Sequence, residues 1–200
     1  MQEKNDTVSG RAEATRPGSG PRVLVAAASK HGSTWEIATS LAHDLIDCAA
    51  GRAIGLDAVA VPVEQQPDPS SFDAVLLGSA VYVGRWLEPA REFASTHLTS
   101  LRGRPVWLFS SGPIGAPPFP PDEPHDAQPI GTMLSARGHR VFPGRLEKER
   151  LSIGERAMVT AMRAPLGDFR DWAMVHAWAE EIASAVARES GAPAAPGDRA

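Results

Sequence analysis

The chain has 200 residues, of which 42% are hydrophobic and 22% are charged, the usual composition of a globular domain. This length predicts one domain with flanking tails, and the composition argues against a fibrous or wholly disordered chain. The formal charge is −4, from 20 Lys and Arg against 24 Asp and Glu, whereas a nucleic-acid binder should carry a basic excess.

Both ends of the chain are polar and rich in glycine and proline. We expect residues 1–21 and 190–200 to be disordered tails around one domain at 22–189. Residues 1–21 lack the apolar core of a signal peptide, and no apolar run is long enough to cross a bilayer. We therefore expect a cytoplasmic protein, with peripheral contact at the inner face of a membrane left open.

Between the tails, apolar runs of strand length alternate with segments of helical spacing. The runs predict strands at 23–28, 56–61, 73–79, 105–110 and 139–146. Helices are expected from residue 33 until Gly51 ends the first, then at 87–98, 130–136, 155–162 and from 168 to 186. Residues 33–36 have capping-box spacing, Asp168 is a good N-cap for the last helix, and the proline-rich stretch 112–129 is a loop.

This alternation predicts an α/β fold with helices on both faces of a doubly wound parallel sheet. Five strands fit the order 2-1-3-4-5. In such a sheet a ligand binds beyond the carboxyl ends of the strands, at the point where the strand order reverses.

The sequence lacks several common site motifs. A single cysteine, Cys48, excludes a disulfide framework and a cysteine-based zinc site, and we expect it to be an inert core residue. The histidines form no HxxxH pair, so we expect no metal site of that kind, and there is no GxSxG nucleophile motif.

The loop after the first predicted strand, residues 29–34, is the first candidate site. Its hydroxyls, its glycine and the following helix N-terminus suit an anion. It matches neither a Walker A loop nor GxGxxG, which argues against a classical ATPase or a Rossmann NAD enzyme. The alternative is that Ser33 and Glu36 only cap the helix.

Four segments in order resemble a known family. They are VLVAAASKHGST at 23–34, GSAVYVGRW at 78–86, SSGP at 110–113 and GDFRDW at 167–172. The first resembles the phosphate loop of flavodoxin-like proteins. Together, over about residues 22–187, they resemble a flavodoxin subgroup that includes the menaquinone-dependent protoporphyrinogen oxidases of haem biosynthesis.

This resemblance implies FMN, bound by three loops. The phosphate would lie against Ser29, Lys30, His31, Gly32, Ser33 and Thr34. The isoalloxazine would be flanked by Ser79, Ala80, Val81, Tyr82, Gly84 and Trp86, and by Ser110, Ser111, Gly112, Pro113 and Gly115. Tyr82 and Trp86 are the available aromatic walls, although Trp86 would equally suit core packing. We identify no catalytic acid or base; His31 is interpreted as a polar loop residue.

The charge distribution bears on the choice of function. Residues 22–100 carry five basic against nine acidic groups, and residues 101–150 seven against five. Such weak charge argues against a dedicated acidic electron shuttle. The basic cluster Arg137, Arg140, Arg145, Lys148 and Arg150 would suit a porphyrin carboxylate, an anionic membrane surface or simply solvent.

The sequence thus favours an FMN-dependent oxidoreductase that takes electrons from a reduced substrate such as protoporphyrinogen. A quinone or another acceptor, including a redox protein partner, would receive them. Two alternatives stay open: a non-catalytic FMN electron carrier, and a flavodoxin-like interaction module without flavin. The oligomeric state is not indicated.

Overall fold

The structure is a computed structural model, and it describes residues 20–112, 124–161 and 163–190. The predicted tails therefore lie almost wholly outside the described residues, as does most of the predicted proline-rich loop.

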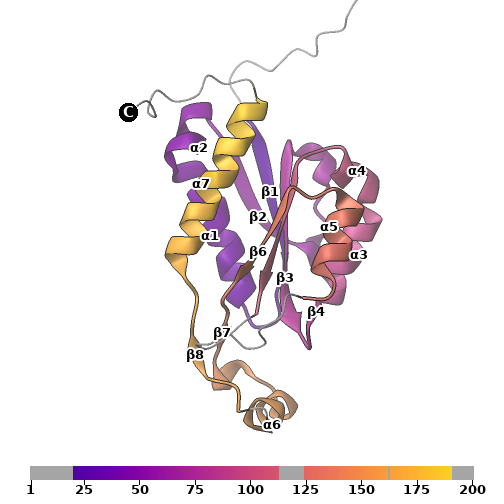
Figure 1. The fold of residues 1–200 in the computed structure, drawn as a ribbon, viewed down its shortest axis with the longest axis vertical. Helices are drawn as coiled ribbons and strands as arrows, with labels where there is room; N and C mark the ends of the chain where they lie inside the picture. Colours follow the sequence, from indigo (N-terminus) through magenta and orange to yellow (C-terminus); the bar gives the residue numbers. More distant parts are fainter. Residues whose placement is uncertain (1–19, 113–123, 162, 191–200) are drawn as a thin grey trace, which may run out of the picture.

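A parallel sheet forms the centre of the molecule (Figure 1). Within the described residues, its parallel strands lie in the order β2-β1-β3-β5-β6, which confirms the predicted order. Their bounds are Arg22–Ala28 for β1, Asp57–Pro62 for β2, Ala74–Tyr82 for β3, Val106–Ser111 for β5 and Gly138–Phe142 for β6. A short strand, β4 (Arg85–Trp86), pairs antiparallel with the end of β3.

Helices cover both faces of the sheet (Figure 1). One face carries α1 (Ser33–Asp47), α2 (Ala49–Ile54) and α7 (Trp172–Glu189), and the other carries α3 (Glu88–Thr96), α4 (Leu98–Arg102) and α5 (Ala127–Leu134). The 3₁₀ turns η1 (Val63–Gln65) and η2 (Pro69–Ser71) follow β2. Successive residues of a strand point to opposite faces, so Val23 and Val25 enter one core and Leu24 and Ala26 the other.

The prediction that the first helix ends at Gly51 is wrong, because α1 ends at Asp47. Cys48 adopts an extended conformation between α1 and α2, and Gly55, with φ of 62°, ends α2. Gly51 is buried inside α2, where an added Cβ would lie 1.8 Å from the carbonyl oxygen of Leu45. This glycine therefore serves close packing and not helix termination. Cys48 is buried, and its Sγ accepts a hydrogen bond from the Gly51 amide at 3.3 Å.

The expected strand at 139–146 is split, because Pro143 and Gly144 follow β6. The next residues leave the sheet as β7 (Arg145–Leu146), which pairs antiparallel with β8 (Gly167–Asp168). The prediction that the last helix begins at Asp168 is therefore wrong. Asp171 caps it instead and accepts a hydrogen bond from the Met174 amide at 3.0 Å.

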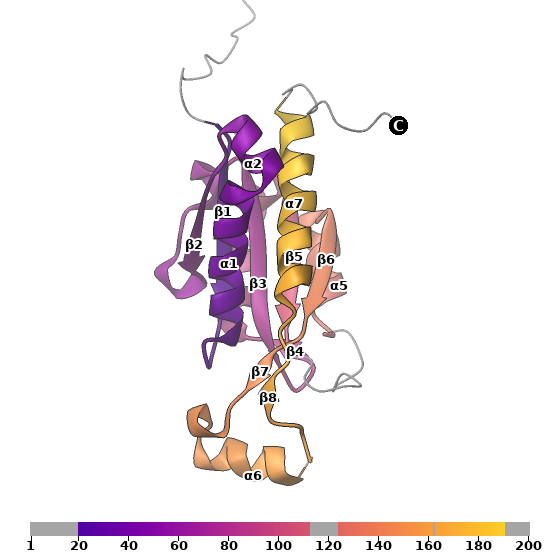
Figure 2. The same cartoon turned by 90° about the vertical axis from the view of Figure 1, so that its left-hand side faces the viewer.

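We call residues 143–171 the arm. It contains β7, the 3₁₀ turn η3 (Lys148–Arg150), helix α6 (Ile153–Ala161) and β8. Figure 2 shows α6 lying beyond the carboxyl ends of the strands, joined to the body by the β7–β8 ribbon. Among the described residues of α6, none is buried. No helix in the described part of the chain has the length and apolar character needed to cross a membrane.

Candidate functional site

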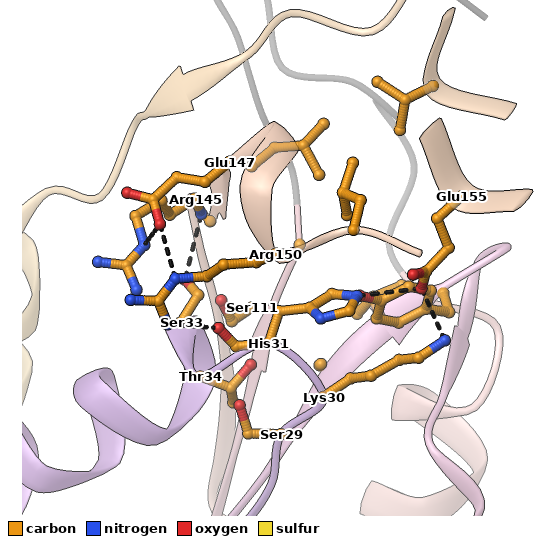
Figure 3. A pocket seen from close by; sticks show the side chains of 18 of the residues that line it. Ser29, Lys30, His31, Ser33, Thr34, Ser111, Arg145, Glu147, Arg150 and Glu155 are labelled. Atoms are coloured by element: carbon orange, nitrogen blue, oxygen red, sulfur yellow. Dashed lines mark hydrogen bonds and ion pairs between the residues drawn. The ribbon is translucent and has the colours of Figure 1, made fainter. Parts of the chain in front are cut away.

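A cavity of about 530 Å³ lies at the carboxyl ends of β1, β3 and β5, where the strand order reverses. Its size is typical of small-molecule sites. The body contributes Ser29, Lys30, His31, Ser33, Thr34, Ala80, Val81, Tyr82, Val83, Ser111 and Gly112. The arm contributes Gly144, Arg145, Leu146, Glu147, Arg150, Leu151, Glu155, Met158, Val159 and Ala164 (Figure 3).

The loop at 29–34 presents backbone N–H groups at the start of α1. Gly32 is the N-cap residue and has the left-handed conformation (φ 86°, ψ −18°), which residues with a side chain rarely adopt. A left-handed residue next to helical residues aims successive N–H groups into one concavity, and the helix end adds partial positive charge. The loop is therefore built to receive an anion.

The predicted capping box is wrong. Within the described residues α1 has no side-chain cap, because its N-cap is Gly32, which has no side chain, and Ser33 is already the first helical residue. Glu36 accepts from Arg145 Nη2 at 2.7 Å and from Arg170 Nη1 at 2.5 Å. Burial works against ionisation of Glu36, but the hydrogen bonds from Arg170 and Arg145 outweigh it and lower the pKa of this carboxyl. These contacts fasten the arm to the first turn of α1.

Hydroxyl groups add to the donors of the loop. The Ser29 Oγ is buried and has no partner within the described residues. An unpaired buried hydroxyl is costly, and since Ser29 lines the cavity, its oxygen is available to a ligand bound there. Thr34 is buried as well, and the Ser33 Oγ accepts a hydrogen bond from the Arg145 amide at 3.1 Å.

A second group of charged residues joins the arm to the loop. The Glu155 carboxylate of α6 lies 2.7 Å from Lys30 Nζ and 3.0 Å from His31 Nε2 (Figure 3). It also accepts from the Ser152 amide at 2.8 Å. The hydrogen bond from Lys30, followed by those from Ser152, holds the pKa of Glu155 well below its usual range. Glu155 therefore stays ionised and bound to the loop.

Tyr82 lies on the cavity wall, with Lys30 Nζ 4.9 Å from the centre of its ring. Burial, and then the negative charge of Glu155, raise the pKa of Tyr82 to about 12. The phenol therefore keeps its proton at physiological pH. The next two residues, Val83 and Gly84, both have positive φ and turn the chain back into β4.

The cavity brings together most of the predicted cofactor residues, but not all of them. Trp86 is 2% exposed and lies in the core, where its indole N–H donates to Ser110 Oγ at 2.7 Å. Ser79 and Ser110 are fully buried, and Ser79 Oγ accepts from the Leu87 amide at 2.9 Å. These side chains support β4 and do not line the cavity. Gly84 lies in the β3–β4 turn, and Pro113 and Gly115 lie outside the described residues.

The sequence motifs did not predict that the arm lines the cavity. Two sequence features fall largely in the arm, the segment at 167–172 and the basic residues Arg145 and Arg150, but neither belongs to the predicted cofactor loops. The other arginines of the basic cluster, Arg137 and Arg140, pair with Glu189 and Glu181 on α7. No sequence pattern identified Glu155 as a site residue, because its contact with His31 spans 124 positions of sequence. Within the described residues, no group of three or more His, Cys, Asp or Glu side chains could hold a metal ion.

Comparisons with known proteins bear on the family and the fold of the chain. The model of a family described as the flavodoxin domain matches residues 24–172, well over half of the chain. No curated protein matches the sequence.

Solved structures share the fold at low sequence identity. A flavodoxin from the domain Archaea is 13% identical, with a TM-score of 0.56 over 82% of this chain and 98% of that one. An oxidoreductase from Corynebacterium diphtheriae is 14% identical, with a TM-score of 0.53 over 85% and 99%. A flavodiiron core from Synechocystis is 12% identical, with a TM-score of 0.59 over 86% of this chain but 37% of that one.

Proposed function

The chain belongs to the flavodoxin domain family, and on that premise we propose that it is an FMN-dependent oxidoreductase acting on a small reduced substrate. Membership of the family implies flavin mononucleotide (FMN) as the cofactor and electron transfer as the chemistry. The substrate and the acceptor are part of the proposal.

The residues of the cavity fit FMN. The amides at the start of α1, with the hydroxyls of Ser29, Ser33 and Thr34, would hold the phosphate. The unpaired Ser29 Oγ supports this assignment. The segments 80–82 and 111–112 would flank the isoalloxazine; they pack so closely that a Cβ on Gly112 would lie 2.8 Å from that of Val81.

The chemistry supplied by bound FMN is acceptance of a hydride equivalent from the reduced substrate and release of the electrons to an acceptor. The chain itself binds and orients. The cavity wall carries three cations, Lys30, Arg145 and Arg150, against two carboxylates, Glu147 and Glu155, and this small positive excess favours a ligand that gains negative charge. Tyr82 keeps its hydroxyl proton and can donate a hydrogen bond.

The position of the arm over the cavity is the observation that favours an enzyme over a simple electron carrier. The body lines the cavity with Ala80, Val81 and Val83, and the arm adds a second apolar wall. That wall consists of Leu146, Leu151, Met158, Val159 and Ala164. An electron carrier needs its cofactor accessible to a protein partner, whereas an enzyme needs a walled site that excludes water. The resemblance of segments 78–86, 110–113 and 167–172 suggests protoporphyrinogen as the substrate and a quinone as the acceptor.

Two measurements test the proposal. An absorbance spectrum of the purified protein, with mass identification of the released flavin, should show FMN. Anaerobic addition of protoporphyrinogen should then bleach the flavin spectrum, and a menaquinone analogue should restore it. Reduction only by a redox protein partner would instead assign an electron carrier. No flavin, even after reconstitution, would leave a flavin-free interaction module.

A further inference from the structure

We propose that Arg150, from the arm, is a ligand of the FMN phosphate, so that the phosphate ties the arm to the body. The proposal rests on FMN binding in the cavity described above. It assigns to this chain a charged phosphate ligand that comes from outside the phosphate loop.

The position of the Arg150 guanidinium carries the inference. Its Nη1 donates to the carbonyl oxygen of His31 at 3.1 Å. The same nitrogen lies 3.1 Å from where a Cβ on Gly32 would be. Because Gly32 begins the concavity of N–H groups at α1, the guanidinium lies at the rim of that concavity. Figure 3 shows the Arg150 side chain extending beside the loop, between Glu147 and Ser33.

Arg150 is also the cavity cation best placed to accept a new partner. Arg145 binds Glu36 through both terminal nitrogens, at 2.7 and 3.1 Å, and Lys30 binds Glu155 at 2.7 Å. Arg150 binds Glu147 through Nε at 2.7 Å, while its Nη1 bonds a neutral carbonyl. A phosphate dianion is a stronger acceptor than a carbonyl, and the planar guanidinium can bind it through two N–H groups.

Two consequences distinguish this role from general packing. First, Arg150 should favour FMN over riboflavin, which lacks the phosphate. Loss of a charge-assisted hydrogen bond should weaken FMN binding by about tenfold to a hundredfold and leave riboflavin binding nearly unchanged. Second, FMN should slow amide exchange in α6, because η3 and α6 are contiguous parts of the arm.

The test compares Arg150→Met, which keeps the apolar stem, with Lys148→Met as a matched control. Lys148 lies on the same 3₁₀ turn, is exposed and does not line the cavity. Dissociation constants for FMN and riboflavin are measured by flavin fluorescence, at low and high salt. We expect a weaker FMN complex with a smaller salt dependence in Arg150→Met only, and partial rescue in Arg150→Lys.

The outcomes separate the two levels of the proposal. If the wild-type protein binds neither flavin, the proposed function fails. If it binds FMN, but Arg150→Met weakens both flavins equally or neither, the function stands and Arg150 is not a phosphate ligand. Slower exchange in α6 on adding FMN, absent in Arg150→Met, would support the link between phosphate and arm; equal slowing in both proteins would overturn it.

Discussion

At the scale of single residues, a buried polar chain supports the end of β5. The Trp86 indole N–H donates to Ser110 Oγ, which also lies 2.8 Å from His139 Nε2. The Trp86 amide donates to Asp126 Oδ2 at 3.0 Å. A buried hydroxyl needs partners, so the indole both fills the core and satisfies Ser110.

Trp86→Ala should therefore be costly to the fold. Removing a buried tryptophan leaves a cavity, and the free energy of unfolding should fall by about 3–5 kcal/mol. Trp86→Phe, which loses mainly the hydrogen bond, should cost about 1–3 kcal/mol. Urea unfolding measures both. Trp172→Ala is the control, because Trp172 is 42% exposed, and it should cost about 1 kcal/mol or less. Equal losses at both tryptophans would contradict the core position of Trp86.

At the scale of elements, the turn between β3 and β4 is strained. Tyr82 pairs with Arg85, and the two residues between them, Val83 and Gly84, have φ of 51° and 72°. Positive φ at both positions is the geometry of a type I′ turn, which favours Asn-Gly. A β-branched residue is a genuine outlier there. Val83 is also 85% exposed on the cavity rim, so its side chain gains little from burial.

Val83→Asn should relieve this strain. We expect the free energy of unfolding to rise by about 1 kcal/mol, and the melting temperature by roughly 2–4 °C. Val59→Asn, at an exposed position of β2, is the control and should lower the melting temperature, because asparagine disfavours strands. A melting temperature for Val83→Asn no higher than that of the wild type would show that the turn carries no strain.

The attachment of α6 to the loop should depend on acid. The pKa of Glu155 in the folded chain lies below its ordinary value of 4.5. The contact is therefore fully present above that ordinary value and is lost as the pH falls through the lowered one. Amide exchange in α6, corrected for the intrinsic rate, should be constant from about pH 7 to pH 5 and become faster in stronger acid.

Glu155→Gln should show fast exchange in α6 already at neutral pH, with no further acid dependence. Glu149→Gln is the matched control, since Glu149 is exposed on the preceding turn. If Glu155→Gln and the wild type exchange alike at pH 7, the carboxylate does not hold the arm.

The strands are the elements that sequence patterns predict well. Apolar runs such as 23–28 and 105–110 predicted their strands to within one or two residues, because a strand buried on both faces has a strong local signature. The strand order and the edge that carries the cavity followed from that alternation. The position of the arm could not be predicted from local patterns, because Glu36 bonds Arg145 and Arg170 across more than a hundred positions of sequence. Glu36, whose spacing from Ser33 predicts a capping box, instead forms ion pairs with these two arginines.

At the scale of the whole molecule, the arm is attached to the body but adds little to its core. Among the described residues of the arm, Leu151 is the one buried hydrophobic residue, and no described residue of α6 is buried. The two strands of the ribbon lie side by side, with Leu146 paired to Gly167. A type I′ turn could therefore join them directly. The ion pairs of Arg145 and Arg170 with Glu36 would remain.

Replacing residues 147–166 by Asn-Gly should leave a folded body. The free energy of unfolding should fall by at most about 3 kcal/mol, mainly from the loss of Leu151, because ion pairs that keep contact with solvent, such as Lys30–Glu155, contribute little. FMN affinity should fall by at least as much as in Arg150→Met, since the shortened chain lacks both that cation and the apolar wall. Calorimetry and flavin titration measure the two effects. A loss of cooperative unfolding would make the arm part of the core, and an unchanged FMN affinity would remove the arm from the cofactor site.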